Sequence, residues 1–398
     1  MNIKKYLLLF LCLPCFMQAK TITISRLTCE MQEGLVVVEG SPRLGWVMES
    51  PENGTRQSAY EIDIREAFTG RSVWNSGKVY STQSQLVSIE GADIRPDNQF
   101  NYSWRVRVWD ETDAPSEWSR EAKFRSASSR LSEGKWIGAI ARQNAHLPEG
   151  RKFHGGELKK PEVKAAWEAV DTLAKKSICL RRTFQVGDRT EGNTNRQSGK
   201  KIVEATAYVC GLGFYEFSLN GKKVGNSEFA PLWSDYDKTV YYNTYDVTEQ
   251  LRHGENAVGI LLGNGFYNVQ GGRYRKLQIS FGPPTLLFEL VINYEDGTST
   301  TLRSDNDWKY DFSPVTFNCI YGGEDYDARR EQKGWNQVGF DDSHWRPVVI
   351  QEAPKGILRP QMAPPVKIME RYDIQKVTKL NAEQIASASK STKRTVDP

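Results

Sequence analysis

The fold is decided by one stretch, YVCGLGFYEFSLNGKKVG at residues 208–225, which continues as NSEFAPLWSDYDKTVYYNTYDVTEQLRHGENAVGILLGNGFYN at residues 226–268. Tyr215, Phe217 and Leu219 alternate with polar or acidic residues. Asn220-Gly221 follows, and this dipeptide readily adopts the positive φ angles of a tight two-residue turn. The apolar pattern resumes at Val224. The first part of the stretch therefore predicts a β-hairpin.

A corner between two strands is predicted further along. Asp246 or Thr248 can cap a single helical turn, and Leu251 can pack that turn onto a core. Gly254 can end the turn in the left-handed conformation. Residues 257–262 (AVGILL) then have the pattern of a buried strand. A strand, one capped turn and a second strand are typical of a corner in an antiparallel sandwich.

Alternating strands extend this pattern to most of the chain. Tyr102, Trp104 and Val106 alternate with polar residues, while residues 178–186 and 285–302 read as a strand and a hairpin. Helical spacing interrupts the β pattern only between Pro161 and Lys176. Within that helix Trp167 could line a groove, but its spacing favours packing onto the sheet.

We therefore expect an all-β fold with four parts: a signal peptide at residues 1–19, a fibronectin type III/Ig-like sandwich at 21–127, a jelly-roll (galactose-binding-like) sandwich at 134–350 with a loop-and-helix insertion at about 141–177, and at 351–398 the truncated start of a further β-domain with a disordered C-terminal tail. The tail, from residue 381, contains no aromatic side chain. Such a segment cannot bury enough apolar surface to become ordered.

Composition excludes several classes of function. After removal of the predicted leader the chain has 51 basic and 49 acidic residues, which leaves no electrostatic footprint for nucleic acid.

The leader has Lys4 and Lys5 before a short apolar run and a plausible cleavage site after Ala19, so we expect an exported periplasmic or extracellular protein without a membrane span. Cys15 offers a lipoprotein alternative, which the preceding Pro14 disfavours.

The cysteines and histidines show no metal-binding or redox pattern. Four cysteines follow the leader, namely Cys29, Cys179, Cys210 and Cys319. No close pair exists among them, so buried free thiols are expected, with one disulfide as the alternative. The four histidines lack ligand spacing, and the glycine runs lack the context of a phosphate loop. We therefore expect no metal and no cofactor.

The order of these motifs resembles the N-terminal β-domains of bacterial α-L-rhamnosidases, glycoside hydrolase family 78. The resemblance rests on the hairpin, the Asp-Val-Thr corner, Gly-Asn-Gly-Phe-Tyr at 263–267, Gly-Glu-Asp-Tyr-Asp-Ala-Arg at 323–329 and Phe-Asp-Asp-Ser-His-Trp at 340–345. It covers roughly residues 40–370, a span that suits two β-domains. The family's catalytic domain is an α/α barrel, and this sequence holds only one convincing amphipathic helix.

The resemblance assigns no catalytic residue to this chain. The family's acid and base belong to the barrel, so neither role carries over to a position here. The local acidic segment consists of Glu324, Asp325 and Asp327, with Arg329 beside it. Neighbouring guanidinium groups hold carboxyl pKa values low, whereas a general acid needs a raised pKa. We therefore interpret this segment as a structural ion-pair cluster at a domain interface.

Sugar contact is the remaining chemical hypothesis. Aromatic faces can stack on sugar rings, and polar side chains can bind their hydroxyls. The candidate contact residues are Trp233, Asp235, Tyr236, Asn264, Phe266, Tyr267 and Arg273. Core packing is the alternative for each aromatic residue. Among them, the loop residues Trp233, Phe266 and Tyr267 are expected to be the most exposed.

Two functions of different classes remain open. The first is the N-terminal portion of an exported, inverting α-L-rhamnosidase that hydrolyses terminal α-L-rhamnose from glycans or glycosides, as the resemblance implies. Its partner would be a rhamnose-containing glycan, and the portion would be inactive alone. The second is a non-catalytic carbohydrate-binding or scaffold protein. A helical-barrel reading frame in the DNA beyond Pro398 would favour the first.

Overall fold

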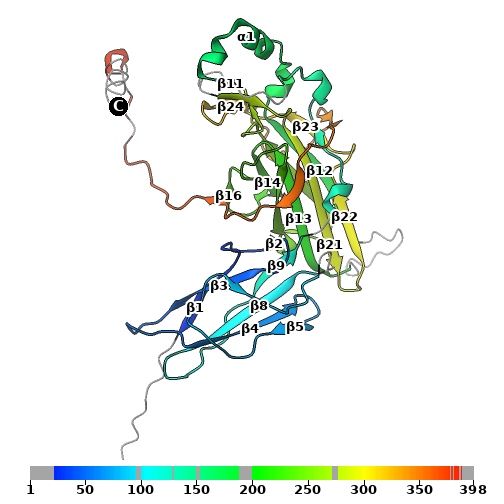
Figure 1. Ribbon diagram of the computed structural model, residues 1–398. Coiled ribbons are helices and arrows are strands. Elements are labelled where there is room, and N and C mark those ends of the chain that lie inside the picture. Colours follow the sequence, from blue (N-terminus) through cyan, green and yellow to red (C-terminus); the bar gives the residue numbers. More distant parts are fainter. Residues whose placement is uncertain are drawn as a thin grey trace, which may run out of the picture. The chain divides into compact units, whose positions relative to one another are not determined.

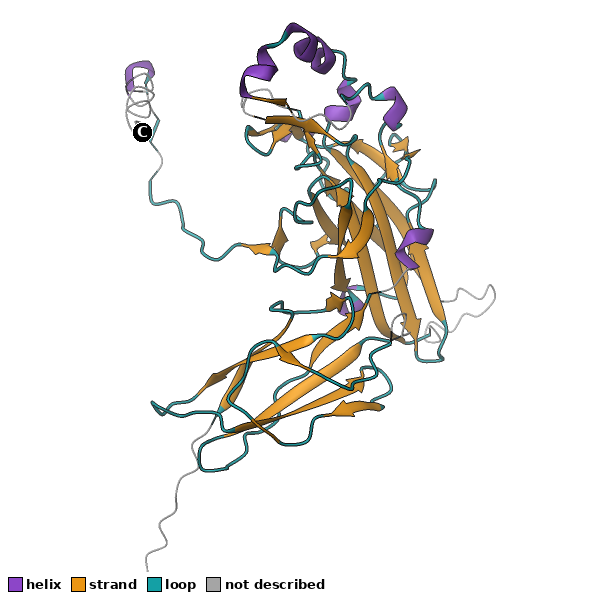
Figure 2. Cartoon of the chain, in the orientation of Figure 1, coloured by secondary structure: helices purple, strands orange, loops and turns teal. Residues whose placement is uncertain are grey.

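The computed structural model describes residues 22–95, 100–127, 130–148, 153–187, 200–270 and 277–376, together with residues 378, 379, 381–384 and 387. Strands dominate the described residues (Figure 1), and the helices, purple in Figure 2, are short. The predicted all-β fold is therefore confirmed. The predicted leader, residues 188–199 and most of the predicted tail lie outside the described residues.

The first sandwich has an immunoglobulin-like pair of sheets. One sheet has the strand order β1-β3-β7, and the other has the order β2-β9-β8-β4-β5, with β6 also paired to β4. These strands are β1 (Thr23–Cys29), β2 (Val36–Val38), β3 (Arg43–Glu49), β4 (Ala59–Glu66), β5 (Ser72–Asn75), β6 (Val79–Tyr80), β7 (Val87–Ser88), β8 (Tyr102–Trp109) and β9 (Ala122–Ser126).

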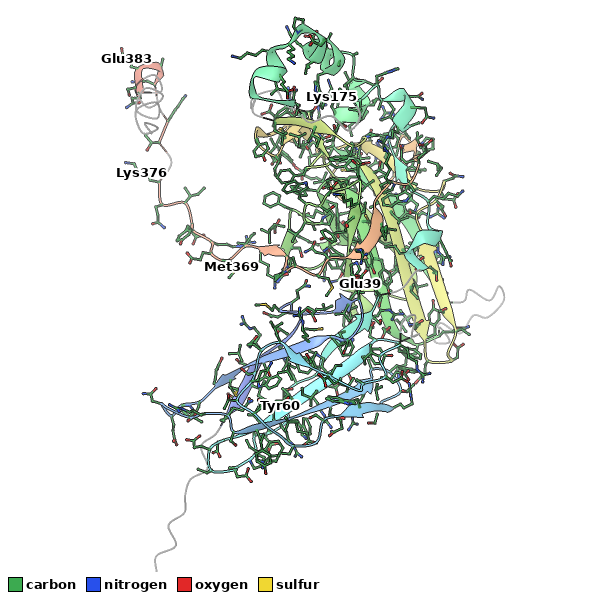
Figure 3. The ribbon with its side chains drawn as sticks, viewed as in Figure 1. Glu39, Tyr60, Lys175, Met369, Lys376 and Glu383 are labelled. Atoms are coloured by element: carbon green, nitrogen blue, oxygen red, sulfur yellow. The ribbon has the colours of Figure 1, made fainter. Side chains whose placement is uncertain are left out.

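The core of this sandwich follows from the alternation that the sequence predicts. Ile62 lies opposite Val106 and Ile64 lies opposite Trp104 in the antiparallel β4–β8 pair. All four side chains are buried, because residues two apart in a strand point to the same face. Tyr60, labelled in Figure 3, packs edge-on against another core ring, that of Trp46, with 5.2 Å between the ring centroids.

The second sandwich is the jelly roll, and two large sheets form it. The first sheet has the order β27-β10-β21-β13-β17-β28, with β22 paired to β21, and the second has the order β15-β14-β18-β12-β23-β26. Their strands are β10 (Ile137–Gly138), β12 (Ile178–Val186), β13 (Ile202–Leu212), β14 (Tyr215–Leu219), β15 (Lys222–Lys223), β17 (Thr239–Asp246), β18 (Gly254–Leu262), β21 (Thr285–Tyr294), β22 (Ser299–Arg303), β23 (Lys309–Phe312), β26 (Arg346–Pro347), β27 (Val349–Ile350) and β28 (Ile357–Pro360).

Shorter elements connect these sheets. They are the strands β11 (Phe153–His154), β16 (Ser227–Glu228), β19 (Asn268–Val269), β20 (Leu277–Ser280), β24 (Val315–Cys319), β25 (Gly323–Tyr326) and β29 (Val366–Lys367), the helix α1 (Pro161–Glu168), and the 3-10 helices η1 (Arg130–Glu133), η2 (Arg142–Asn144), η3 (Gly155–Lys159), η4 (Thr172–Lys175), η5 (Thr248–Gln250) and η6 (Ala328–Arg330). Strands β11, β20 and β19 form a separate three-stranded sheet in that order, and β24 and β25 form a hairpin.

The hairpin forms as predicted, and so does the single turn of the corner, but the turn ends at Gln250 and Gly254 begins strand β18 instead of ending the turn. Asn220 and Gly221 have φ angles of 53° and 82°, and β14 and β15 pair antiparallel on either side of them. The Asp246 carboxylate accepts hydrogen bonds from the Thr248 backbone N–H at 3.1 Å and from its hydroxyl at 2.5 Å, immediately before the turn η5, whose N-cap residue is Val247. Gly254 has φ 87°, in the left-handed region that favours glycine.

The inserted helix is shorter than its apolar spacing predicts. Helix α1 starts at Pro161, as expected for a first-turn proline, and ends at Glu168. Asp171 then caps the separate turn η4 through a 2.7 Å hydrogen bond from the Leu173 backbone N–H. Trp167 is buried, but it packs in the insertion's own apolar cluster with Val163 and residues of the adjoining loops.

The four described cysteines are all buried and free, which confirms the expectation of free thiols.

Residues 367–398 separate from residues 1–366 as a second compact unit. In that unit Met369, Tyr372 and Ile374 are largely exposed. Strand β29 is a short strand within the predicted start of a further β-domain and comprises only Val366 and Lys367.

Candidate functional site

Five aromatic side chains from different loops form one surface cluster on the jelly roll, called the aromatic cluster below. Its members are Phe214, Phe229, Trp233, Phe266 and Tyr321. The Trp233 ring stacks on Phe266 with a centroid distance of 5.0 Å and an interplanar angle of 25°. Phe214 lies 5.6 Å from Phe229 and 6.0 Å from Phe266, ring centroid to ring centroid. Trp233 is 60% exposed and Phe229 59%.

Glycines bring two of these loops into backbone contact. A Cβ atom at Gly213 would lie 1.9 Å from the carbonyl oxygen of Gly263, and one at Gly265 would lie 2.7 Å from the backbone nitrogen of Phe214. No side chain fits at either distance. The Gly-Asn-Gly run therefore allows the backbones of the two loops to pack against each other, which places Phe266 next to Phe214.

A groove of about 530 Å³ adjoins the aromatic cluster. Its lining includes the apolar side chains of Phe214, Phe229 and Ile320 and the carboxylates of Glu216, Glu228 and Glu324. Lys223 lies among them, 2.8 Å from Glu228 and 3.3 Å from Glu216, nitrogen to oxygen. Burial alone would lower the pKa of Lys223, but these two carboxylates outweigh it and raise the pKa. Lys223 is therefore held as a cation.

The structure brings only part of the predicted sugar-contact set to the surface. Trp233 is exposed and Phe266 is half-buried. The expectation that Tyr267 is exposed is wrong, because it is only 3% exposed, and Tyr236 is buried to the same degree. These two rings pack edge to face at 5.0 Å and both contact Phe281. Their aromatic surface is therefore used inside the domain.

Asn264 is also buried, and its amide has a structural role. It donates a hydrogen bond to the Lys175 carbonyl at 3.0 Å, and its carbonyl oxygen accepts one from Asn268 at 2.8 Å. Asn268 donates a second bond, to the Ala174 carbonyl at 2.8 Å. The two amides thereby tie the end of the insertion, where Figure 3 labels Lys175, to the loop after β18. Asn264 is thus not available to a ligand in this arrangement.

The last two predicted contact residues lie differently. Asp235 is half exposed and forms an ion pair of 3.1 Å with Lys238, one turn along the chain. It does not line the groove. Arg273 lies outside the described residues, as does the neighbouring Tyr274.

The acidic segment behaves as an ion-pair cluster at Asp327. This carboxylate caps η6 by accepting the Arg329 backbone N–H at 3.2 Å and pairs with the Arg329 guanidinium at 2.8 Å. Arg330 lies 3.3 Å away, from nitrogen to oxygen. The hydrogen bonds from Arg329 lower the pKa of Asp327 to about 2. Glu324 and Asp325 lie on β25, in the two-stranded hairpin with β24.

Sequence reasoning missed Phe214, Phe229 and Tyr321 as members of the cluster. Phe214 and Tyr321 each stand beside glycines, at Gly213 and Gly322, where a turn can expose a large ring. That signal was available in the sequence. Phe229 has no such neighbour, and its exposure follows from a positive φ angle of 53° that only the structure reveals.

In the described part of the chain, no group of three or more His, Cys, Asp and Glu side chains is arranged to hold a metal ion. Nor does any helix described there combine the length and apolar character that crossing a bilayer requires.

Comparison with known proteins assigns both sandwiches. Residues 24–129 match the "Rha78A-like, N-terminal immunoglobulin domain" family, and residues 200–370 match the "Alpha-L-rhamnosidase N-terminal domain" family. An α-L-rhamnosidase of Formosa agariphila is 34% identical over 390 residues, which cover 94% of this chain and 39% of that protein. One from Streptomyces avermitilis is 27% identical, covering 87% of this chain and 46% of the relative.

Solved structures agree with these relatives. The α-L-rhamnosidase of Dictyoglumus thermophilum is 29% identical with a TM-score of 0.63, over 88% of this chain and 37% of that one. The S. avermitilis enzyme, solved in complex with L-rhamnose, is 25% identical with a TM-score of 0.66, over 88% of this chain and 47% of that one. The chain spans between 32% and 46% of the length of the four curated relatives. It therefore belongs to the α-L-rhamnosidase family and corresponds to that family's N-terminal immunoglobulin-like and jelly-roll domains.

Proposed function

We propose that this chain is the non-catalytic N-terminal β-part of an exported α-L-rhamnosidase that removes terminal α-L-rhamnose from glycans or glycosides. The observation that carries the proposal is the alignment with the F. agariphila α-L-rhamnosidase, which covers 94% of this chain but only 39% of the relative. The described residues thus correspond to a minor part of such an enzyme. Their proposed role is to support and orient the part that performs hydrolysis.

The carboxyl groups of the described residues support a non-catalytic role for this part of the enzyme. Glycosidases need two facing carboxyl groups, and the general acid needs a raised pKa. Among the described carboxyl groups, Glu204 is the one whose pKa is resolved as raised, because it is buried. Its carboxylate faces Arg125 and the backbone of Asn101, and it lines none of the grooves described above. It is therefore suited to holding domains together rather than to protonating a sugar.

A chimera tests the supporting role directly. Residues 22–370 of this chain would replace the aligned N-terminal part of the F. agariphila relative, with that relative's own remaining sequence kept unchanged. We expect the chimera to hydrolyse an aryl α-L-rhamnoside, and the same relative with its N-terminal part deleted to be insoluble or inactive. The chain by itself is expected to show no turnover. Turnover by the purified chain alone, or a folded but inactive chimera, would argue against the proposal.

Export is part of the same proposal, on the strength of the leader pattern at residues 1–19. Expression of the full sequence in a Gram-negative host should place the protein in the periplasm with Lys20 as its first residue, which intact-mass spectrometry would measure. Retention of Met1 in the cytoplasm would refute this part. A mass increased by a lipid at Cys15 would instead support the lipoprotein alternative.

The second candidate function is a chain that binds carbohydrate without a catalytic partner. The exposed aromatic cluster beside a groove with carboxylates favours it, because sugar sites combine these two features. Binding of a rhamnosyl glycan by this chain, together with a chimera that fails to support catalysis, would favour this function over the first.

A further inference from the structure

The lining of the groove beside the aromatic cluster combines apolar rings with carboxylates. Phe214 and Phe229 supply the rings, and Tyr321 lies near them through its contact with Phe266 at 5.9 Å between ring centroids. Glu216, Glu228 and Glu324 supply hydrogen-bond acceptors. Its volume of about 530 Å³ falls inside the range of roughly 300–1,000 Å³ that is usual for small-molecule sites.

The charges in the groove are mostly satisfied within the protein. Lys223 bridges Glu216 and Glu228, so these two carboxylates already have a cationic partner. No described residue forms an ion pair with Glu324. The groove therefore offers one carboxylate next to exposed rings. A multiply charged cationic ligand would gain little from this arrangement. A neutral ligand with an apolar face and hydroxyl groups could contact both the rings and the carboxylate.

Phe229, which lines the groove, has a strained backbone conformation. Its φ of 53° is unusual for a bulky residue, because Cβ is then crowded against the following carbonyl. The next residue is fixed in turn: the Ala230 carbonyl accepts a hydrogen bond from the Tyr215 backbone N–H at 2.8 Å. The result is a phenyl ring that remains 59% exposed at the groove. Strained backbone of this kind is often associated with functional sites.

We infer that this groove binds the terminal 6-deoxyhexose of a rhamnosyl glycan, with the sugar's C6 methyl group and apolar ring face against Phe229 and Phe214, and its hydroxyls donating to Glu324. The identity of the sugar rests on the proposed function, while the groove and its mixed lining of rings and carboxylates stand on the geometry alone. Phe266 and Trp233 extend the apolar surface toward a second sugar unit, because their rings stack on each other and continue from Phe214.

The binding is expected to be weak. The Phe229 ring in the lining stays 59% exposed, so the groove covers little of a bound sugar. A dissociation constant in the millimolar range is expected, corresponding to about −4 kcal/mol at 1 mM. A stacking ring contributes roughly three- to tenfold in affinity. Loss of a single ring should therefore be measurable as a shift of the titration midpoint.

The test uses the whole chain and three sugars, namely L-rhamnose, a rhamnosyl disaccharide and L-mannose, which is L-rhamnose with a hydroxyl added at C6. Saturation-transfer NMR and tryptophan fluorescence would follow titrations into the tens of millimolar. We expect binding of both rhamnose ligands, strongest saturation at the C6 methyl protons, and several-fold weaker binding of L-mannose. Absence of binding by both rhamnose ligands, or equal binding of L-mannose, would overturn the inference.

Variants separate binding from folding. Phe229→Gly removes the ring and also relieves the positive φ, so it should unfold no more easily than the parent while its affinity falls by about tenfold. Phe229→Tyr should retain binding, and Glu324→Gln should weaken it. Tyr80→Ala removes a 76% exposed ring from the other sandwich and is the matched control, with no expected change. Unchanged affinity in Phe229→Gly would overturn the inference.

The inference and the proposed function can fail separately. If the chain does not bind rhamnose but the chimera hydrolyses the aryl rhamnoside, the groove assignment is wrong and the supporting role stands. If the chimera is inactive but Phe229→Gly abolishes rhamnose binding by the chain, the groove assignment stands and the supporting role is wrong.

Discussion

The backbone N–H of Asn101 donates a 2.9 Å hydrogen bond to the carboxylate of Glu204, which joins the immunoglobulin-like sandwich to strand β13 of the jelly roll. Arg125 approaches the same carboxylate, with 3.5 Å between nitrogen and oxygen, and both side chains are almost fully buried. A second pair, Lys123 with Asp246 at 2.6 Å, connects the same two domains. The junction is thus built from charges that are buried or half-buried.

Arg125→Ala should destabilise the protein strongly. It leaves the Glu204 carboxylate buried without its cation, and the loss of one partner from a buried pair typically costs about 3–5 kcal/mol. Urea unfolding followed by fluorescence measures the change. The matched control is Arg359→Ala, which removes the ion pair with Glu39 (labelled in Figure 3), where both side chains are more than 40% exposed. That exposed pair should contribute at most about 1 kcal/mol. Equal losses in the two variants would contradict burial as the cause.

Glu204→Gln should remove a pH-dependent contribution to stability. Burial raises the pKa of Glu204 above the ordinary 4.5, against the opposing effects of the Asn101 N–H and Arg125. A raised carboxyl pKa means that the folded state holds the proton more tightly, so this contribution is complete below pH 4.5 and is lost as pH rises through the folded pKa. The free energy of unfolding of the parent, relative to Glu204→Gln, should therefore fall as pH increases from 4. A relative stability that rises with pH would refute the raised pKa.

Gly221→Ala should cost more than Gly297→Ala, although both glycines have φ near 80°. Each substitution places a Cβ in the left-handed region, at a cost of roughly 1 kcal/mol. The Cβ at Gly221 would also lie 2.7 Å from Cγ of Gln337, whereas the one at Gly297 meets nothing within 4 Å. The difference in unfolding free energy between the two variants isolates this clash. We expect it to disappear in the Gln337→Ala background, and persistence there would contradict the assignment.

Asn264→Ala should lower stability and leave sugar binding unchanged in the folded fraction. It removes the hydrogen bond to the Lys175 carbonyl and the acceptor for Asn268, both buried, at an expected cost of about 1–3 kcal/mol for each unsatisfied group. Thermal unfolding and the rhamnose titration together measure both effects. Trp233→Ala is the counterpart: its ring is 60% exposed, so stability should change by less than about 1 kcal/mol. The reverse pattern would restore Asn264 as a contact residue.

Local patterns predicted most of the scaffold because each rests on neighbouring residues. Strand β12 begins and ends where its apolar run does, at Ile178 and Val186, and the Asn220-Gly221 turn has the φ angles that its residues favour. The helix was overestimated because apolar spacing continues past Glu168, although Asp171 caps a new turn there. Side-chain capping competes with helix continuation, and spacing alone does not register it.

The site was less predictable, since exposure depends on segments far apart in the sequence. Tyr267 and Phe266 are adjacent in the same glycine-rich loop, yet Tyr267 packs on Tyr236 and Phe281, while Phe266 contacts Trp233 and Tyr321. Alternation puts neighbouring side chains on opposite faces but does not say which face a distant loop covers. Asn264 was likewise predicted to contact a sugar, because the sequence does not show that its side-chain amide donates a hydrogen bond to the Lys175 carbonyl of the insertion.

The four free, buried thiols have a practical consequence. Burial raises the pKa of Cys210, near the end of β13, and of Cys179 in β12, so neither is poised to react as a thiolate. Folding of residues 22–366 thus requires no disulfide-forming oxidase and no disulfide isomerase. A recombinant version without its leader can accordingly be made in a reducing cytosol and handled in thiol-containing buffer.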